Sequence, residues 1–241
     1  MALIIKRVAV AVSTNDLIKR AVEKDGDISK LIIADRQTGG RGRRGNSFFS
    51  PKGGTYFSFA VPYPENDSTL TAAAGVAVCR VLRSRGISAG IKWVNDIYVD
   101  GRKAGGILCE KATGQDGAAY AVIGIGLNTG KARFPSELTD VACSIDANMP
   151  PASLASAISD EFFEIRRTGL DIDEYGALSV LIGRDVRWTE SGVEKTGRAT
   201  GVDEQCGLAV KTASGVTVLR SGEVNTVRPI GEDIDKQAGF V

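Results

Sequence analysis

A glycine- and arginine-rich segment in the first quarter of the chain has residue types that suit phosphate binding. It covers residues 37–54 and contains six glycines, no acidic residue and four cations: Arg41, Arg43, Arg44 and Lys52. Glycines leave backbone N–H groups free to converge on an anion, and arginine donates paired, charged hydrogen bonds. A solvated surface loop has the same composition, and the absence of stacking aromatics within the arginine run disfavours contact with nucleic acid.

A second segment, residues 92–110, places polar side chains within apolar sequence. Asn95 and Asp96 interrupt a run that otherwise has the pattern of a strand, where an unpartnered carboxylate would be costly, so they need hydrogen bonds, a cation or a metal ion. Lys103 begins the expected return strand, which brings its ammonium near the same pocket. The alternative is a polar hairpin in which Asp96 caps a turn and Lys103 is a solvent-facing cation.

Two shorter segments carry weaker signals. Asn128 follows an apolar strand, and its amide offers both a donor and an acceptor to a flat heterocycle such as adenine, although Asn after a strand is more often a turn residue. Ser13, Thr14 and Asn15 precede a helical pattern. Helix capping is the default interpretation there, and contact with a ligand is the alternative.

Composition restricts the chemistry. The 241 residues include no histidine, which excludes Ser-His-Asp and Cys-His catalysis and zinc sites that need imidazole. The four cysteines lie at least thirty residues apart with no CxxC pair, which favours reduced thiols and a cytoplasmic location. No apolar stretch reaches the roughly 18 residues of a membrane span.

The net charge of +1 hides an uneven distribution of charge. Residues 36–95 contain nine basic and two acidic residues, whereas the rest of the chain carries an excess of acidic residues. This basic region indicates an anionic ligand. The lack of a basic excess elsewhere argues against DNA as a partner.

Hydrophobic periodicity predicts the elements that hold these segments. Strands are expected within the first twelve residues, where the apolar run 8–12 leads into a helix, and over residues 31–34, 55–61, 91–99, 107–110 and 119–127, with the hairpin 91–110 turning at residues 100–101. Helices are expected after Ser13, between residues 69 and 86, and over residues 152–168 and 174–181. The fold class is therefore α+β, a mixed sheet with flanking helices.

The chain changes character after about Leu181. Residues 183–229 show five short strands about ten residues apart, at 186–188, 196–202, 208–211, 216–219 and 223–228. Such spacing predicts a small β-barrel domain.

Taken together, the polar segments resemble those of the biotin protein ligases. The matching motifs are Ser13-Thr14-Asn15, the Gln37–Gly54 loop, Lys92-Trp93-Val94-Asn95-Asp96 with Lys103, Gly106-Ile107-Leu108-Cys109-Glu110, and Gly124-Ile125-Gly126-Leu127-Asn128. Three residues depart from the family pattern: Asn46 replaces Arg, Phe48 replaces Trp and Val94 replaces Pro. The resemblance implies a class II synthetase-like catalytic domain over residues 1–181, an SH3-like β-barrel over 182–231 and a tail over 232–241.

The resemblance also implies ATP, Mg²⁺ and biotin as ligands, biotinyl-5′-AMP as the intermediate, and a lysine of a biotin carboxyl carrier protein as the acceptor. The implied catalytic residues are Lys103, Arg41, Arg43 and Asp96, and Asp96 is also the candidate for holding the metal ion or deprotonating the acceptor lysine. The implied biotin-binding residues are Ser13, Thr14, Asn15, Gln37, Gly40, Arg41, Lys103, Gly105 and Gly106. The implied ATP-binding residues are Arg41, Arg43, Arg44, Phe48, Lys92, Asn95 and Asn128.

Two other functions remain open on the sequence: a lipoate protein ligase, and a catalytically silent module that binds biotinyl-AMP. The family often pairs through an exposed sheet edge, which predicts a homodimer or docking of the acceptor domain by strand addition. Ser13 lies too near the N-terminus for the DNA-binding module of the members that repress transcription, so we expect no repressor role.

Overall fold

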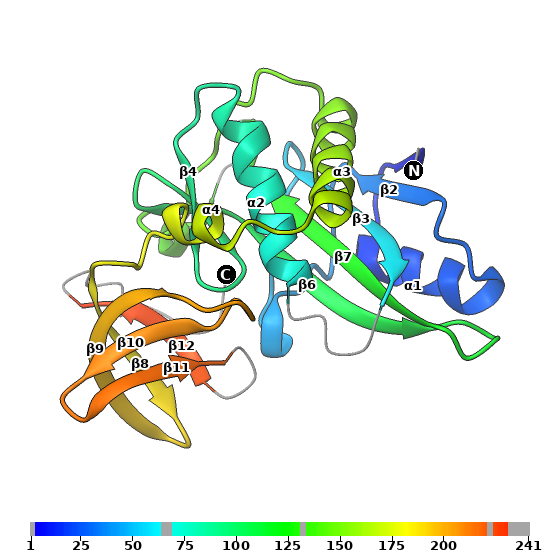
Figure 1. Cartoon of the computed structure of the whole chain (residues 1–241). Helices are drawn as coiled ribbons and strands as arrows, with labels where there is room; N and C mark the ends of the chain where they lie inside the picture. Colours follow the sequence, from blue (N-terminus) through cyan, green and yellow to red (C-terminus); the bar gives the residue numbers. More distant parts are fainter. Residues whose placement is uncertain (1–2, 64–68, 131–133, 221–223, 231–241) are drawn as a thin grey trace.

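A computed structural model describes residues 3–63, 69–130, 134–220 and 224–230 (Figure 1). Seven strands form a mixed sheet in the order β1-β2-β3-β7-β6-β5-β4. Their bounds in that order are β1 (Ile4–Val8), β2 (Lys30–Ala34), β3 (Thr55–Pro62), β7 (Ala119–Leu127), β6 (Arg102–Thr113), β5 (Asp96–Val99) and β4 (Ala89–Lys92). β1 pairs with β2 in parallel, and the other neighbouring pairs are antiparallel.

Helices pack on both faces of this sheet (Figure 1). α2 (Leu70–Arg83) and α3 (Pro151–Thr168) pack together on one face, and α1 (Thr14–Asp25) covers the other. The alternation of strand side chains explains the two layers, because Leu31 and Ile33 join the α2–α3 core while Ile32 joins a smaller core with Ile18 and Val22 of α1. The predicted mixed sheet with flanking helices is confirmed.

The central strands bring together three glycines, Gly106, Gly124 and Gly126, which we call the glycine strip; Gly124 lies against Asn15 of α1, and Gly106 and Gly126 lie against Phe48. Gly124 of β7 pairs with Leu108 of β6 on one side and with Ser58 of β3 on the other. Gly126 pairs with Gly106. The register therefore leaves a strip of bare backbone in the middle of the sheet.

A second, antiparallel sheet follows α4 (Ile172–Ala177), in the order β11-β10-β9-β8-β12. Its strands are β8 (Asp185–Glu190), β9 (Val193–Val202), β10 (Leu208–Thr212), β11 (Gly215–Leu219) and β12 (Val224–Pro229). The indole Nε1 of Trp93 donates a 2.8 Å hydrogen bond to the carbonyl of Cys206, in the turn between β9 and β10. This buried contact joins the C-terminal sheet to the turn at residues 93–95, between β4 and β5.

Several predicted elements have different bounds in the structure. The first strand covers Ile4–Val8, within the predicted first twelve residues, but it ends before the apolar run 8–12 is complete. The last helix covers Ile172–Ala177 rather than 174–181. It starts earlier because the Asp171 carboxylate caps it by accepting from the N–H groups of Asp173 and Glu174. The expected strand 91–99 is split by a turn at residues 93–95, so Asn95 lies in a turn.

The return strand after Asp100 is longer than predicted and runs over Arg102–Thr113. The start of the last predicted strand at residue 223 and the tail over 232–241 lie outside the described residues. Within the described residues, no helix is long and apolar enough to cross a membrane.

Candidate active site

A pocket lies between the N-terminal end of α1, the arginine loop and the glycine strip. It is lined by residues from five separate segments: Ser13, Thr14, Asn15, Gln37, Arg41, Gly42, Phe48, Asn95, Lys103, Gly106, Ile107, Leu108, Gly124, Ile125 and Gly126. Nine of these lining residues were predicted as ligand-binding residues: Ser13, Thr14, Asn15, Gln37, Arg41, Phe48, Asn95, Lys103 and Gly106. The fold thus brings most of the predicted site together.

The glycine strip lets other side chains approach the floor of the pocket. A Cβ atom at Gly124 would lie 2.1 Å from Asn15 Oδ1, and one at Gly126 would lie 2.6 Å from Phe48 Cε1. Any larger residue at these positions would therefore displace Asn15 or Phe48. Phe48 lies across the floor and reaches Gly106 as well, where a Cβ atom would be 3.5 Å from Phe48 Cε2.

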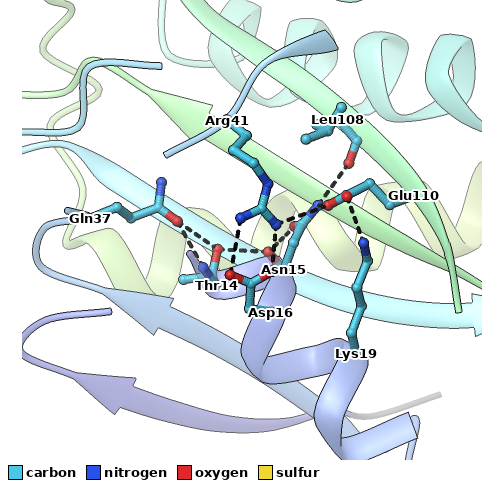
Figure 2. Close-up of polar contacts among 9 residues, drawn as sticks. Thr14, Asn15, Asp16, Lys19, Gln37, Arg41, Leu108 and Glu110 are labelled. Carbon is cyan, nitrogen blue, oxygen red and sulfur yellow. Dashed lines mark hydrogen bonds and ion pairs between the residues drawn. The ribbon is translucent and has the colours of Figure 1, made fainter. Parts of the chain in front are cut away.

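Gln37 connects the arginine loop, residues 37–54, to the first turn of α1 by hydrogen bonds (Figure 2). Its Oε1 accepts from the Thr14 backbone N–H at 2.8 Å, and its Nε2 donates to Ser50 Oγ at 3.0 Å. Ser13 occupies the N-cap position, yet its side chain makes no capping hydrogen bond. The default interpretation of Ser13 as a side-chain cap is therefore wrong, because the Gln37 amide satisfies a helix N–H instead.

Asn15 is held by residues that sequence reasoning did not assign to the site. Its Nδ2 donates to Glu110 Oε2 at 2.7 Å and to the Leu108 carbonyl at 3.3 Å, while its Oδ1 accepts from Ser58 Oγ at 2.6 Å. Glu110 also binds Lys19 Nζ at 2.6 Å (Figure 2). Glu110 stands in a matched motif, but nothing in the sequence placed it against α1.

Arg41 is paired with Asp16 on α1, a contact that was not predicted from the sequence. Arg41 Nη2 and Nη1 lie 2.5 Å and 3.0 Å from the two Asp16 carboxylate oxygens, and Nη2 lies 3.7 Å from Glu110 Oε2 (Figure 2). The hydrogen bonds from Arg41 lower the pKa of Asp16. Burial acts to raise the pKa of Glu110, but Lys19, Asn15 and Arg41 together lower it. Both carboxyls are therefore ionised at neutral pH.

Lys103 and Asp96 face each other across the β5–β6 ladder. Lys103 Nζ lies 2.9 Å from Asp96 Oδ1 and 5.9 Å from the centroid of the Phe48 ring. Lys103 is 8% exposed, so the interpretation of this lysine as a solvent-facing cation is wrong. The register of the hairpin holds the ammonium against the glycine strip, where water screens it less.

Arg43 and Asn95 lie beside this pair. Arg43 Nη1 donates to Asn95 Oδ1 at 3.5 Å, and Asn95 is fixed by a 3.1 Å hydrogen bond from its Nδ2 to the Ile107 carbonyl. Burial lowers the pKa of Arg43, with the charge of Arg44 acting in the same direction. A half-buried cation of this kind gains from a nearby anion.

The remaining predicted residues lie outside the pocket lining. Lys92 Nζ contacts the Tyr98 hydroxyl at 3.1 Å, and Arg44 is exposed in a left-handed backbone conformation with φ of 58°. Gly40 packs against the Phe48 carbonyl and Gly105 against that of Gly126. Asn128 is 4% exposed, and within the described residues its Oδ1 has no hydrogen-bond partner. Such a buried acceptor fits a ligand that donates a hydrogen bond.

Asp96 supplies one carboxylate to the site. In the part of the chain that the structure describes, no three His, Cys, Asp or Glu side chains come together as a metal site. Mg²⁺ in nucleotide-binding sites is commonly held by one or two carboxylates together with substrate phosphates. The single carboxylate of Asp96 beside a phosphate-suited loop fits that donor set.

Comparisons with known proteins agree with this fold and site. Residues 8–128 match the biotin/lipoate A/B protein ligase family, and residues 181–225 match the biotin protein ligase C terminal domain. The chain therefore belongs to the biotin/lipoate A/B protein ligase family. Its C-terminal match points within that family to the biotin protein ligases.

Individual relatives show the same relationship. A "Bifunctional ligase/repressor BirA" of Bacillus spizizenii is 29% identical over 80% of this chain, and the chain spans 65% of that relative's length. A "Biotin--[acetyl-CoA-carboxylase] ligase" of Mycobacterium tuberculosis is 29% identical over 92% of this chain and 88% of its own length. The solved structure of the biotin protein ligase from Aquifex aeolicus in complex with biotin and ATP superposes with a TM-score of 0.79 at 26% identity, covering 93% of this chain and 98% of that one.

Proposed function

We propose that this protein is an ATP-dependent biotin protein ligase. It activates biotin as biotinyl-5′-AMP and transfers the biotinyl group to a lysine of a biotin carboxyl carrier protein. The observation that carries the proposal is that the buried Lys103 and the loop residue Arg41 line one glycine-floored pocket, while Arg43 contacts the pocket-lining Asn95.

In the first step, a carboxylate oxygen of biotin attacks the α-phosphorus of ATP, and pyrophosphate leaves. Two anions must approach each other, and negative charge grows on the α-phosphate oxygens in the transition state. Lys103 is suited to contact both the biotin carboxylate and the α-phosphate, while Arg41 and Arg43 neutralise the phosphates. Cations fixed in place before the reaction stabilise such a transition state without reorganising.

The two substrates occupy different parts of the pocket in this proposal. Ser13, Thr14, Asn15 and Gln37 hold the biotin ring from the α1 side, with the backbone of Gly40, Gly105 and Gly106 beside the valeryl chain. On the nucleotide side, Asn95 within the pocket and Lys92 and Arg44 outside its lining contact ATP, and Phe48 lies beneath it. The partnerless Oδ1 of Asn128 is a suitable acceptor for the exocyclic amine of adenine.

In the second step, the amine of the acceptor lysine attacks the acyl carbon of biotinyl-AMP, and AMP leaves. Asp96 is suited to accept the proton of that lysine or to help hold Mg²⁺. When bound, Mg²⁺ would neutralise phosphate charge. No step requires a covalent enzyme intermediate, which agrees with a chain that has no histidine.

The acceptor domain or a second copy of the chain can add to the edge strand β1. β1 is the first strand in the order of the larger sheet, and its Ile4 and Ile5 are 64% and 41% exposed. An exposed apolar strand edge suits strand addition by a partner.

The test is transfer of labelled biotin or labelled lipoate, with ATP, to a biotin carboxyl carrier domain. The proposal predicts ATP-dependent labelling of one lysine by biotin and none by lipoate. Preferred transfer of lipoate would identify a lipoate ligase. Binding of biotinyl-AMP without any transfer would identify a silent binding module.

A further inference from the structure

The guanidinium of Arg41 is occupied by a carboxylate of the protein itself. Both Nη atoms of Arg41 bind Asp16, in the paired arrangement by which arginine binds carboxylates and phosphates (Figure 2). Glu110 flanks the same edge, with Oε2 3.7 Å from Arg41 Nη2. The donor edge of this pocket-lining arginine is therefore already in use.

We propose that Asp16 is an internal competitor of the substrate anion for Arg41 and so sets how tightly that anion binds. The inference rests on the function proposed above. Asp16 occupies the same two donors that a carboxylate or phosphate oxygen pair would need. A substrate anion that takes this edge must displace Asp16, since two anions on one guanidinium edge repel each other.

The surroundings of the pair make Asp16 displaceable. The Asp16 side chain is 28% exposed and that of Arg41 35%, so water screens their attraction and can solvate the carboxylate after exchange. Asp16 also lies in the first turn of α1, near Lys19 and Arg20. The helix N-terminus and these cations continue to stabilise the carboxylate once Arg41 has moved.

Glu110 differs from Asp16 in this respect. It is bound by Lys19 Nζ at 2.6 Å and by Asn15 Nδ2 at 2.7 Å in addition to its looser contact with Arg41. These bonds tie Glu110 to α1 whether or not Arg41 remains nearby. The hydrogen bonds to Asp16 within this cluster come from Arg41. Asp16 is therefore the carboxylate that a substrate anion displaces from Arg41.

The competing substrate anion has two sources, the carboxylate of biotin and the phosphates of ATP. An uncharged analogue of biotin with the same shape distinguishes two effects of a substitution at Asp16. A change in pocket shape would alter the binding of both ligands, whereas loss of competition for Arg41 would alter only the binding of the charged one. Biotinamide, in which an uncharged amide replaces the carboxylate, is such an analogue. Binding of ATP tests competition between Asp16 and the phosphates.

The experiment measures the Kd values of biotin, biotinamide and ATP by calorimetry for the wild type and three variants. Asp16→Asn removes the charge but keeps the shape, and Asp16→Glu keeps the charge. Asp27→Asn is the control, because Asp27 pairs with Lys30 beyond the other end of α1 and does not line the pocket. It removes the same unit of charge without affecting Arg41.

Asp16→Asn should lower the Kd of biotin, of ATP, or of both by about two- to fivefold, the range for losing an ion pair of this exposure. Its Kd for biotinamide should be unchanged, and Asp16→Glu and Asp27→Asn should match the wild type for every ligand. If Asp16→Asn bound biotin and ATP no more tightly than the wild type, or if it bound biotinamide more tightly by the same factor, Asp16 would not compete for Arg41. Either result would leave the proposed function intact. A wild type that binds no biotin would refute the proposed function and this inference with it.

Discussion

The ammonium of Lys103 lies 2.9 Å from the carboxylate of Asp96 at the floor of the pocket, and the two side chains are 10% and 23% exposed. The pairing places the ammonium group in a poorly hydrated part of the site, where substrate anions can approach it. It also helps to fix the ammonium in position, and both Phe48 and Gly106 lie close to the Lys103 side chain. Lys103 is therefore prepared for charge that develops during the reaction.

Lys103→Met should lower the rate of biotin-dependent pyrophosphate release by at least about 100-fold, the loss typical of removing one preorganised charge-stabilising donor. The variant should remain folded, with a free energy of unfolding lowered by roughly 1–3 kcal/mol, because the mostly buried Asp96 carboxylate loses its partner. Lys111→Met is the control, as Lys111 is an exposed lysine on the same strand, β6. Normal pyrophosphate release by Lys103→Met would remove this lysine from the mechanism.

Arg43→Gly should let biotinyl-AMP escape from the pocket. Arg43 links the loop to Asn95, and glycine would both break that contact and loosen the backbone. The measurement is labelling of an unrelated protein mixed with the carrier domain, and we expect unspecific lysine labelling. Lys52→Gly, an exposed position of the same loop, should label only the carrier domain. Strict labelling of the carrier domain by Arg43→Gly would show that the loop does not retain the adenylate.

Most of the residues that line the pocket could be identified from the sequence, because they occur in compact motifs. The hairpin geometry that joins Lys103 to Asp96, for example, follows from a turn at residues 100–101. Contacts between distant segments were missed, since nothing local to Asp16 or Glu110 indicates that α1 lies over β6. The turn at residues 93–95 was missed for a related reason. Trp93 and Val94 are apolar because they are buried in the core that includes the C-terminal sheet, and a buried turn has the same apolar pattern as a strand.

Trp93→Phe should lower the free energy of unfolding by about 1–2 kcal/mol, because the Cys206 carbonyl loses its buried donor. Trp188→Phe is a matched control. Trp188 is 2% exposed, and its Nε1 has no hydrogen-bond partner among the described residues. Urea unfolding should show a smaller loss for Trp188→Phe than for Trp93→Phe. The reverse order would mean that the Trp93 bond does not hold the two sheets together.

Below neutral pH, stability should change only at the acidic end. Hydrogen bonds from Lys30 and Ser29 lower the pKa of Asp27 to about 2, and partners also lower those of Asp16, Glu110 and Asp203. Carboxyls with a depressed pKa in the folded state stabilise it above their ordinary pKa of about 4, and this stability is lost as pH falls through the folded value. The free energy of unfolding should therefore drop between about pH 4 and pH 2.

Between about pH 5 and pH 7 the same measurement should stay flat, because the sequence has no histidine. Asp27→Asn should weaken the acid-induced loss. Urea unfolding at pH 7, 5 and 3 checks both statements. A marked change in stability from pH 7 to pH 5, or none from pH 5 to pH 3, would contradict this account of the ionised carboxyls.

The central claim is that the pocket joins biotin to ATP. Pyrophosphate release from ATP, measured with biotin, with lipoate and with no acid added, tests it most directly. We expect release that depends on biotin, little with lipoate, and none without an acid. Release with lipoate but not with biotin, or no release with either acid, would contradict the assignment of this pocket to the formation of biotinyl-5′-AMP.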